Sequence, residues 1–258
     1  MKDYHLFLVD LDGTIYRGKD TIASGVRFIH RIKEAGKECL FLTNNTTRTP
    51  QMVVDKLARH GVKTDVSHIY TPNMATVSYI LEQEDWQAKK IGVYLIGQIG
   101  LLQEFLKHPE FELNESNPDY VVVGLDTDFT YHKVQVASTA IQNGAKFIGT
   151  NADVNLPSDQ GLMPGNGSLC AMVAVASGQE PLYIGKPSAI IIEKVLAKFH
   201  CSKKDALLVG DNYETDIKAG FNSGVDQLLV TTGITQAADL IGKKQPTILV
   251  DSLDKVKL

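Results

Sequence analysis

Residues 7–16, near the amino terminus, read Phe-Leu-Val-Asp-Leu-Asp-Gly-Thr-Ile-Tyr and carry the strongest structural signal in the chain. The apolar run stops at two carboxylates one residue apart, Asp10 and Asp12, and Gly13 and Thr14 follow at once. A short apolar run bounded by glycine predicts a buried strand. Ligands of an open parallel sheet bind just beyond the carboxyl ends of its strands. The sequence therefore predicts two carboxylates at a ligand-binding edge.

Two carboxylates at this spacing favour a reaction centre over an ordinary turn once three later segments are considered. Such a pair can hold a hard cation, and one member can attack an electrophile while the other moves a proton. Taken alone, the stretch also fits an Asp-rich turn. However, residues 42–45 (Leu-Thr-Asn-Asn), 184–187 (Ile-Gly-Lys-Pro) and 209–216 (Val-Gly-Asp-Asn-Tyr-Glu-Thr-Asp) also end strand-like runs with polar groups suited to phosphate.

Strand-like and helix-like segments alternate along the whole chain, which predicts an α/β fold with a parallel sheet covered by helices on both faces. Strands are expected over residues 5–10, 39–43, 69–71, 91–96, 120–123, 146–149, 183–184, 206–209, 228–230 and 247–250. Helices are expected over residues 24–35, 101–107, 131–142 and 168–177, and after the Thr-Pro pairs at 49–50 and 71–72. Ser24 is expected to cap the first helix, and Gly36 to end it. Residues 150–167, rich in Asn, Pro and Gly, predict a long irregular loop of functional importance.

Composition narrows the class of protein. The 258 residues are 43% hydrophobic and carry a net charge of −4, which argues against a basic nucleic-acid surface. Three cysteines without a C-x-x-C motif predict reduced thiols, and no apolar stretch approaches the length of a membrane span. We therefore expect a cytoplasmic protein that binds neither a nucleic acid polymer nor a membrane.

The four polar segments, in this order, resemble the motifs of the haloacid dehalogenase superfamily of phosphohydrolases. The first matches the D-x-D-G-T signature of that superfamily, and the last matches G-D-x-x-x-T-D. Residues 150–153, 164–167 and 183–187 are similar to the branch typified by NagD and the p-nitrophenyl phosphatases. The resemblance covers nearly the whole chain. Its one departure is Ala152, where that branch usually has Pro, and this position lies outside the reaction centre.

The resemblance implies a Rossmann-like parallel-sheet core with an inserted α/β cap domain of the C2 type. The segment between Thr43 and Lys186 is far longer than the few tens of residues that a single crossover needs, so it contains an inserted domain. We expect residues 1–74 and 182–258 to form the hydrolase core. Residues 75–181 are expected to form the cap, which confers substrate specificity.

The resemblance also implies the reaction, a Mg²⁺-dependent hydrolysis of small phosphate monoesters through an aspartyl-phosphate. In this scheme Asp10 is the nucleophile, Asp12 is the general acid and base, and Lys186 neutralises the phosphoryl oxygens. The metal ion is expected to be bound by Asp10, by the Asp12 backbone carbonyl and by Asp211. Nucleoside monophosphates, sugar phosphates and aryl phosphates are the expected substrates.

Further residues are expected around this centre. Asp216 is expected to orient Lys186 or a metal-bound water, although a helix N-terminal charge explains it equally well. Asn151 and Asp153, in the loop over residues 150–167, are expected to recognise the leaving group, and a turn-rich connection is the alternative. The remaining expected phosphate-binding residues are Thr43, Asn44, Asn212 and Thr215.

Three other functions compete with hydrolysis. A phosphoryl transferase or mutase on the same scaffold also needs Asp10 and differs in its acceptor. A non-enzymatic phosphate-binding module predicts the loss of a reactive group, yet every group is present. A dehalogenase is disfavoured because displacement at carbon needs no metal ligands. The expected partner is a small phosphorylated metabolite, and a homo-oligomer is left open.

Overall fold

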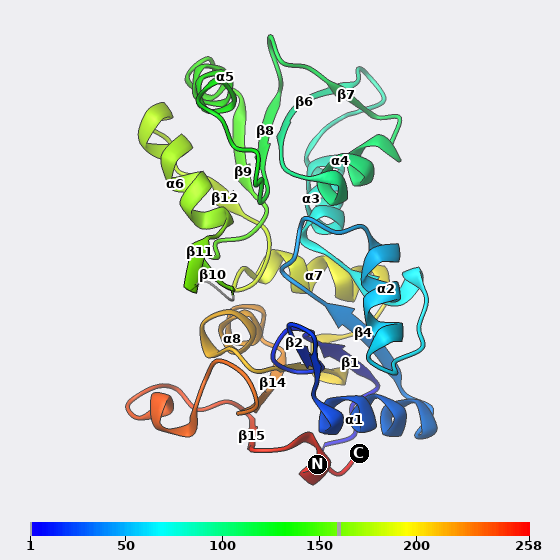
Figure 1. Ribbon diagram of the computed structural model, residues 1–258. Coiled ribbons are helices and arrows are strands. Elements are labelled where there is room, and N and C mark those ends of the chain that lie inside the picture. The colour runs from blue at the N-terminus through cyan, green and yellow to red at the C-terminus, as the bar shows by residue number, and fades with distance from the viewer. Residues whose placement is uncertain (1, 159–160) are drawn as a thin grey trace. The chain divides into compact units, whose positions relative to one another are not determined.

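A computed structural model describes residues 2–158 and 161–258, and the chain forms two compact units (Figure 1). The core unit comprises Met1–Thr43, Pro50–Tyr70 and Lys186–Leu258. The cap unit comprises Asn44–Thr49 and Thr71–Gly185. The domain bounds expected from the sequence stay a prediction.

The core unit is built on a six-stranded sheet in the order β15-β14-β13-β1-β4-β5, with every neighbouring pair parallel. Strand β1 lies between β13 and β4, and its side chains are all buried, as expected for a parallel strand covered on both faces. The strands are β1 (Leu6–Val9), β4 (Glu38–Leu42), β5 (Ile69–Tyr70), β13 (Ala206–Gly210), β14 (Asp226–Val230) and β15 (Ile248–Val250).

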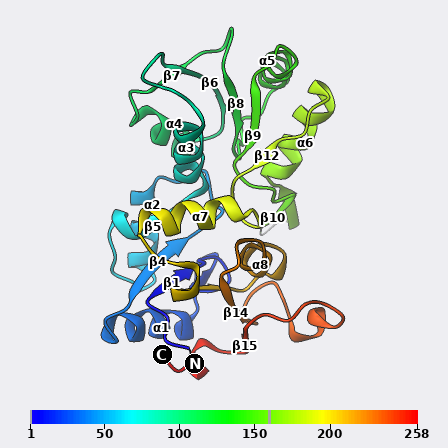
Figure 2. The ribbon, with the colours of Figure 1, turned by 180° about the vertical axis from the view of Figure 1, so that it is seen from behind.

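Alternate residues of the buried core strands point to opposite faces of the sheet, so both faces are apolar and need helices to cover them. One apolar cluster joins strand residues such as Phe7 and Val9 to α1 (Ala23–Glu34) and α2 (Pro50–Arg59). Helices α7 (Ala189–Lys198) and α8 (Lys218–Ser223) pack against each other, as Figures 1 and 2 show from opposite sides. Shorter elements of this unit are the hairpin β2 (Tyr16–Arg17) and β3 (Asp20–Thr21), a π-helical turn over Tyr213–Ile217, and 3₁₀ turns at Val66–His68, Lys203–Asp205, Ala237–Leu240 and Leu253–Lys255.

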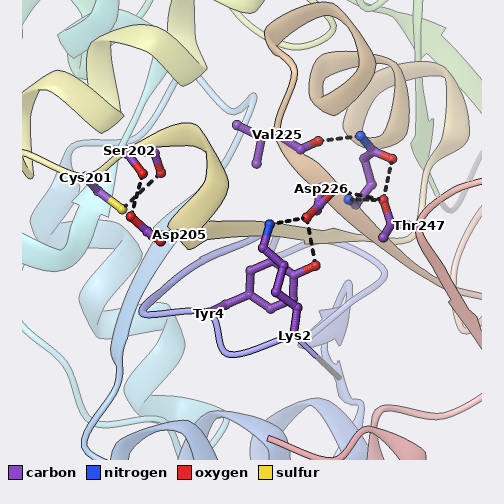
Figure 3. Close-up of polar contacts among 9 residues, drawn as sticks. Lys2, Tyr4, Cys201, Ser202, Asp205, Val225, Asp226 and Thr247 are labelled. Atoms are coloured by element: carbon purple, nitrogen blue, oxygen red, sulfur yellow. Dashed lines mark hydrogen bonds and ion pairs between the residues drawn. The ribbon is translucent and has the colours of Figure 1, made fainter.

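Polar contacts hold the amino ends of the core strands (Figure 3). Asp226, the first residue of β14, accepts hydrogen bonds from Lys2 Nζ and Tyr4 Oη, both at 2.9 Å. Ser202 Oγ donates to Asp205 directly before β13. Burial and the hydrogen bond to Asp226 raise the pKa of Tyr4 to about 12. These contacts stabilise one edge of the sheet and leave the carboxyl ends of the strands for binding.

The cap unit has its own parallel sheet of five strands in the order β12-β9-β8-β6-β7. Helices α3 and α4 pack together, as do α5 and α6, and the two pairs lie on opposite sides of the sheet (Figure 1). An antiparallel hairpin, β10–β11, precedes α6. The strands are β6 (Ile91–Ile96), β7 (Phe111–Leu113), β8 (Tyr120–Val123), β9 (Lys146–Gly149), β10 (Asn155–Ser158), β11 (Gly161–Pro164) and β12 (Leu182–Tyr183). The helices are α3 (Pro72–Gln83), α4 (Ile99–Leu106), α5 (Tyr131–Gln142) and α6 (Asn166–Ser177).

Most expected elements are confirmed within one or two residues, and two expectations are wrong. Ser24 does not cap α1, because the N-cap is Ile22 and it makes no side-chain cap. Residues 150–167 are not wholly irregular, because β10 and β11 pair within them, although residues 159–160 lie outside the described part. The strand expected at 183–184 is confirmed one residue earlier, at Leu182–Tyr183, and it pairs with β9 of the cap sheet. None of the described helices is long and apolar enough to cross a membrane.

Candidate active site

The candidate site lies at the carboxyl ends of four neighbouring strands of the core sheet. Asp10 follows β1, Thr43 follows β4, Asp211 follows β13, and the turn at 231–234 follows β14. These strands are adjacent and parallel, so the residues that follow them meet at the same edge. Three of the four polar segments expected from the sequence, those at Asp10, Thr43 and Asp211, are thus brought together by the order of the core strands; the fourth, with Lys186, follows β12 of the other sheet.

Lys186 connects the carboxylates of this edge. Its Nζ donates to Asp10 Oδ1 at 2.7 Å, to Asp216 Oδ1 at 2.6 Å and to the Leu42 carbonyl oxygen at 3.2 Å. Lysine is rarely buried without partners, and this side chain, which has three, is only 2% exposed. The ammonium therefore occupies a fixed position between two acidic side chains.

Asp10, Asp211 and Asp216 form a group that could hold a metal ion. One carboxylate oxygen from each lies within 4.8 Å of the others, and all three side chains are buried. Carboxylate oxygens are the ligands that hard divalent cations prefer. The arrangement sets three carboxylates against one ammonium, so the cluster is short of positive charge.

The pKa values reflect this shortage. Burial is the main cause that raises the pKa of Asp10 well above its ordinary value. Lys186 opposes the rise, and Asp216 and Asp211 add to it. Burial and then Asp216 raise the pKa of Asp211 to about 7. Burial by itself lowers the pKa of Lys186, but Asp10 and Asp216 outweigh it, so the pKa lies above its usual range and the ammonium stays charged.

Two glycines bring backbone close to the Asp211 carboxylate. A Cβ atom on Gly13 or on Gly233 would overlap with this carboxylate, so neither position has room for a side chain. Gly13 also has a φ of +92°, a conformation that favours glycine. The Ile234 amide donates to Asp211 Oδ2 at 2.7 Å and helps to fix the carboxylate.

Asp12 makes different contacts from Asp10, although only one residue separates them. Its side chain is 58% exposed, and its Oδ1 lies 3.5 Å from Lys56 Nζ of α2. The Asp10 side chain is only 10% exposed and contacts Lys186. In an extended chain, residues two positions apart point to the same side. The two carboxylates therefore have different surroundings only because the chain turns at Gly13.

The expected phosphate-binding residues of the core unit make contacts of their own. Thr43 is buried, and its amide donates to the Tyr70 carbonyl oxygen at 3.3 Å. Asn212 caps the π-helical turn, because its Oδ1 accepts from the Glu214 amide at 3.0 Å. Thr215 lies within that turn and is half-buried. A phosphate-binding role for these three side chains stays a prediction.

Asn44, Asn151 and Asp153 meet in the cap unit. Asn44 Nδ2 donates to both Asp153 carboxylate oxygens, at 3.2 and 3.3 Å. Asn151 Nδ2 donates to the Asn44 backbone oxygen at 2.8 Å. The structure therefore unites one expected phosphate-binding residue with both expected recognition residues of the cap.

Lys56 and Gly233 contribute to the site and are not singled out by the sequence. Lys56 lies within an amphipathic helix, where a lysine is most often a solvated charge. Gly233 follows β14, which neighbours β13 in the sheet. Only this strand order indicates that Gly233 lies near Asp211. The turn Thr-Thr-Gly after an apolar run would have drawn attention once that neighbour was known.

Comparison with known proteins identifies the family. The model for haloacid dehalogenase-like hydrolases matches residues 7–109, and a second, HAD-hydrolase-like model matches residues 183–256. The 5′-nucleotidase YutF of Bacillus subtilis is 41% identical over 98% of this chain and 97% of its own length. An acid sugar phosphatase of Staphylococcus aureus is 39% identical over 95% of this chain and 93% of its own. The structure of NagD from Escherichia coli superposes with a TM-score of 0.91 at 31% identity, covering 100% of this chain and 99% of that one.

These matches agree with the geometry of the site. The family implies a divalent metal cofactor, and the buried Asp10, Asp211 and Asp216 form a group that could hold one. The relatives match the chain over nearly its whole length, so the likeness includes both units. The chain belongs to the haloacid dehalogenase-like hydrolases and is a NagD-like phosphatase.

Proposed function

We propose that this phosphatase hydrolyses small phosphate monoesters with Mg²⁺ and through a phosphoryl group carried on Asp10. The observation that supports this most is the contact of Lys186 Nζ with Asp10 beside a group of three buried carboxylates. A nucleophilic carboxylate needs a neighbouring cation, because a phosphate monoester is itself negatively charged near neutral pH. Lys186 supplies one positive charge, and a bound divalent cation would supply the remaining positive charge that the three carboxylates and the phosphate need.

The residues present fit Mg²⁺. Asp10 and Asp211 would hold the ion with the Asp12 backbone carbonyl, a ligand set rich in oxygen and poor in protein groups, as Mg²⁺ prefers. The raised pKa values of Asp10 and Asp211 indicate negative charge that a cation would compensate. When bound, the ion would offset charge between the nucleophile and the phosphoryl oxygens.

The side chains of the core unit divide the reaction into two steps. In the first step an Asp10 oxygen forms a bond to phosphorus in line with the leaving oxygen, and Asp12 gives that oxygen a proton. In the second step Asp12 takes a proton from water, which attacks the same phosphorus and frees Asp10 and inorganic phosphate. Lys186 stabilises the charge on the phosphoryl oxygens in both steps.

The remaining expected residues have supporting roles in the proposal. Asp216 holds Lys186 in place through the 2.6 Å contact. Thr43 and Asn44 would donate hydrogen bonds to the phosphoryl group, and Asn212 and Thr215 would line the same end of the site. Each of these side chains offers a hydroxyl or an amide, the groups that bind phosphate without adding charge.

The substrates we propose are nucleoside monophosphates, sugar phosphates and aryl phosphates. The names of the relatives, a 5′-nucleotidase and an acid sugar phosphatase, support this class. The partner is then a small phosphorylated metabolite, with neither a nucleic acid polymer nor a membrane involved, and a homo-oligomer stays open. We also propose a cytoplasmic location, which the three free cysteines support, and cell fractionation would test it.

Phosphate trapping with Asp10→Asn tests the covalent step. An acid quench during turnover should leave labelled phosphate on the wild-type protein at Asp10. The Asn variant has nearly the same shape but a poor nucleophile, so it should lose both the label and turnover. Hydrolysis near the wild-type rate in the Asn variant would refute the assignment. Transfer of the label to a second hydroxyl instead of water would favour the mutase alternative.

Asp12→Asn tests the proton transfer. The loss should be on the order of 10²–10⁴-fold for alkyl phosphates, the usual contribution of general acid–base catalysis. It should be much smaller for p-nitrophenyl phosphate, whose leaving group needs little protonation. An equal loss for both esters would contradict the role of Asp12.

We assign the selection among phosphate monoesters to the cap unit. Asp153→Ala removes the partner of the Asn44 amide, and Asn151→Ala removes the bond to the Asn44 carbonyl. If these side chains recognise the leaving group, relative kcat/KM among a panel of monoesters should change by about 1–3 kcal/mol for each lost polar contact. Equal losses across the panel would instead assign them to holding the Asn44 segment.

A further inference from the structure

Among the described residues, the Asp12 carboxylate forms one ion pair, with Lys56 of α2. Lys56 Nζ lies 3.5 Å from Oδ1. In the part of the chain that the structure describes, neither oxygen of this carboxylate accepts a hydrogen bond. The ammonium thus approaches the carboxylate most closely at Oδ1, and Oδ2 is the oxygen farther from it.

Lys56 itself is held in place. Its Nζ lies 3.6 Å from the centroid of the Tyr16 ring, a cation–π contact, and its side chain is only 14% exposed. The Tyr16 ring stacks on His60 with 4.7 Å between centroids and 25° between planes. His60 Nδ1 lies 2.7 Å from Thr21 Oγ1. A lysine packed in this way has few rotamers left, unlike an exposed lysine.

These contacts arise from two elements beside Asp12. Lys56 and His60 are four residues apart on and just after α2, so they lie on one face of the helix. Tyr16 and Thr21 pair across the hairpin β2–β3, which follows the Asp12 loop directly. The Tyr16 carbonyl accepts from the Gly13 amide at 2.8 Å, which joins the hairpin to that loop.

We propose that Lys56 is a positioning residue that fixes the Asp12 carboxylate for proton transfer, an inference that rests on the proposed function of Asp12. General acid–base catalysis needs heavy atoms about 2.6–3.2 Å apart, and the terminal torsion of an aspartate is broad. An Asp side chain that is 58% exposed would sample many orientations without a fixed partner. Lys56 holds Oδ1 and leaves Oδ2 as the oxygen that exchanges the proton with the leaving group and with water.

Lys56→Met in the full chain, assayed with Mg²⁺, tests this role with two esters. For β-glycerol phosphate, whose alkoxide needs protonation, kcat should fall about tenfold, a part of the 10²–10⁴-fold that acid–base catalysis contributes. For p-nitrophenyl phosphate kcat should change by less than about twofold, because that leaving group needs little protonation. KM for both esters should stay near the wild-type value.

Matched variants complete the experiment. Lys56→Arg keeps a cation over Tyr16 and should restore most of the lost kcat. Arg59→Met removes a charge from the same helix without any contact to Asp12 and should leave both esters unaffected. In the Asp12→Asn background, Lys56→Met should cause no further loss, since its effect acts through Asp12. Lys56→Gln replaces Lys56→Met if the latter does not fold.

Two results would overturn the inference. Equal falls in kcat for both esters would make Lys56 a structural residue, and a rise in KM with kcat unchanged would make it a substrate-binding group. Asp12→Asn, measured beside them, separates this failure from failure of the proposed function. If Asp12→Asn distinguishes the esters and Lys56→Met does not, only the role of Lys56 is wrong. If Asp12→Asn does not distinguish them, the proposed function of Asp12 is wrong as well.

Discussion

Replacement of Lys186 by Met should destabilise the core unit strongly, because it removes the one ammonium among three buried carboxylates. Lys186 Nζ contacts Asp10 Oδ1 at 2.7 Å and Asp216 Oδ1 at 2.6 Å, and the side chain is 2% exposed. Met fills a similar volume without charge, so the effect reports electrostatics rather than a cavity. Breaking one buried ion pair by removing a partner costs about 3–5 kcal/mol. We expect a loss in this range, since the carboxylates can recover part of the cost by binding a proton.

Urea unfolding, followed by far-ultraviolet circular dichroism with a chelator present, would measure this loss. The chelator ensures that no divalent cation replaces the missing charge. Trp86 is the single tryptophan and belongs to the cap unit, so its fluorescence gives an internal reference for the other unit. Lys203→Met is the control, because the Lys203–Glu193 pair at 3.4 Å is exposed and such pairs contribute about 0–1 kcal/mol.

The double variant Lys186→Met/Asp216→Asn gives the sharper result. It removes one carboxylate that Lys186→Met leaves without its partner, so it should be more stable than Lys186→Met alone. Additive destabilisation would mean that Asp216 has a separate structural role. A loss for Lys186→Met no larger than that of Lys203→Met would refute the argument that the cluster is short of positive charge.

Three further predictions concern single positions. Asp211→Asn should raise the Mg²⁺ concentration needed for half-maximal hydrolysis, because Mg²⁺ is held by few protein groups, and an unchanged midpoint would contradict a role in metal binding. Gly233→Ala should raise the same midpoint in the same titration, since a Cβ atom there overlaps with the Asp211 carboxylate. Glu84→Gln should cost the cap unit about 1 kcal/mol at neutral pH, because Glu84 accepts hydrogen bonds from Lys146 and Tyr120. The Lys146 and Tyr120 hydrogen bonds lower the pKa of Glu84, so the stability that they contribute is present at neutral pH and lost as pH falls through that pKa. Thermal unfolding of wild type and variant should therefore converge in acid.

The order of the core strands explains why so much of the site could be predicted. Asp10, Thr43 and Asp211 each follow an apolar run, and runs of this kind are typical of parallel strands. Once strands alternate with helices, the carboxyl ends must meet at one edge. Site residues that directly follow a strand can therefore be predicted from the sequence, because the same positions carry both the sequence motif and the end of the strand.

Contacts between elements were not predictable in the same way. Lys56 reads as a charge on an amphipathic helix, and only the packing of α2 beside the hairpin brings its ammonium over Tyr16. The hairpin β10–β11 was missed because Asn, Pro and Gly over residues 150–167 suggest turns, whereas cross-strand pairing decides the outcome. The prediction that Ser24 caps α1 was wrong because the helix begins one residue earlier, at Ala23, and Ile22 occupies the N-cap position.

The charge balance of the site links its stability to its chemistry. Three buried carboxylates and one ammonium make a poor structural arrangement, and an apolar cluster of equal volume would stabilise the fold more. The raised pKa values of Asp10 and Asp211 express the same cost, because negative charge without a partner is disfavoured in the interior. A bound divalent cation would change that balance by adding positive charge, and a bound phosphoryl group would change it by adding negative charge beside Lys186. Affinity for the metal ion and loss of stability in its absence should therefore rise and fall together across variants of Asp10, Asp211 and Lys186.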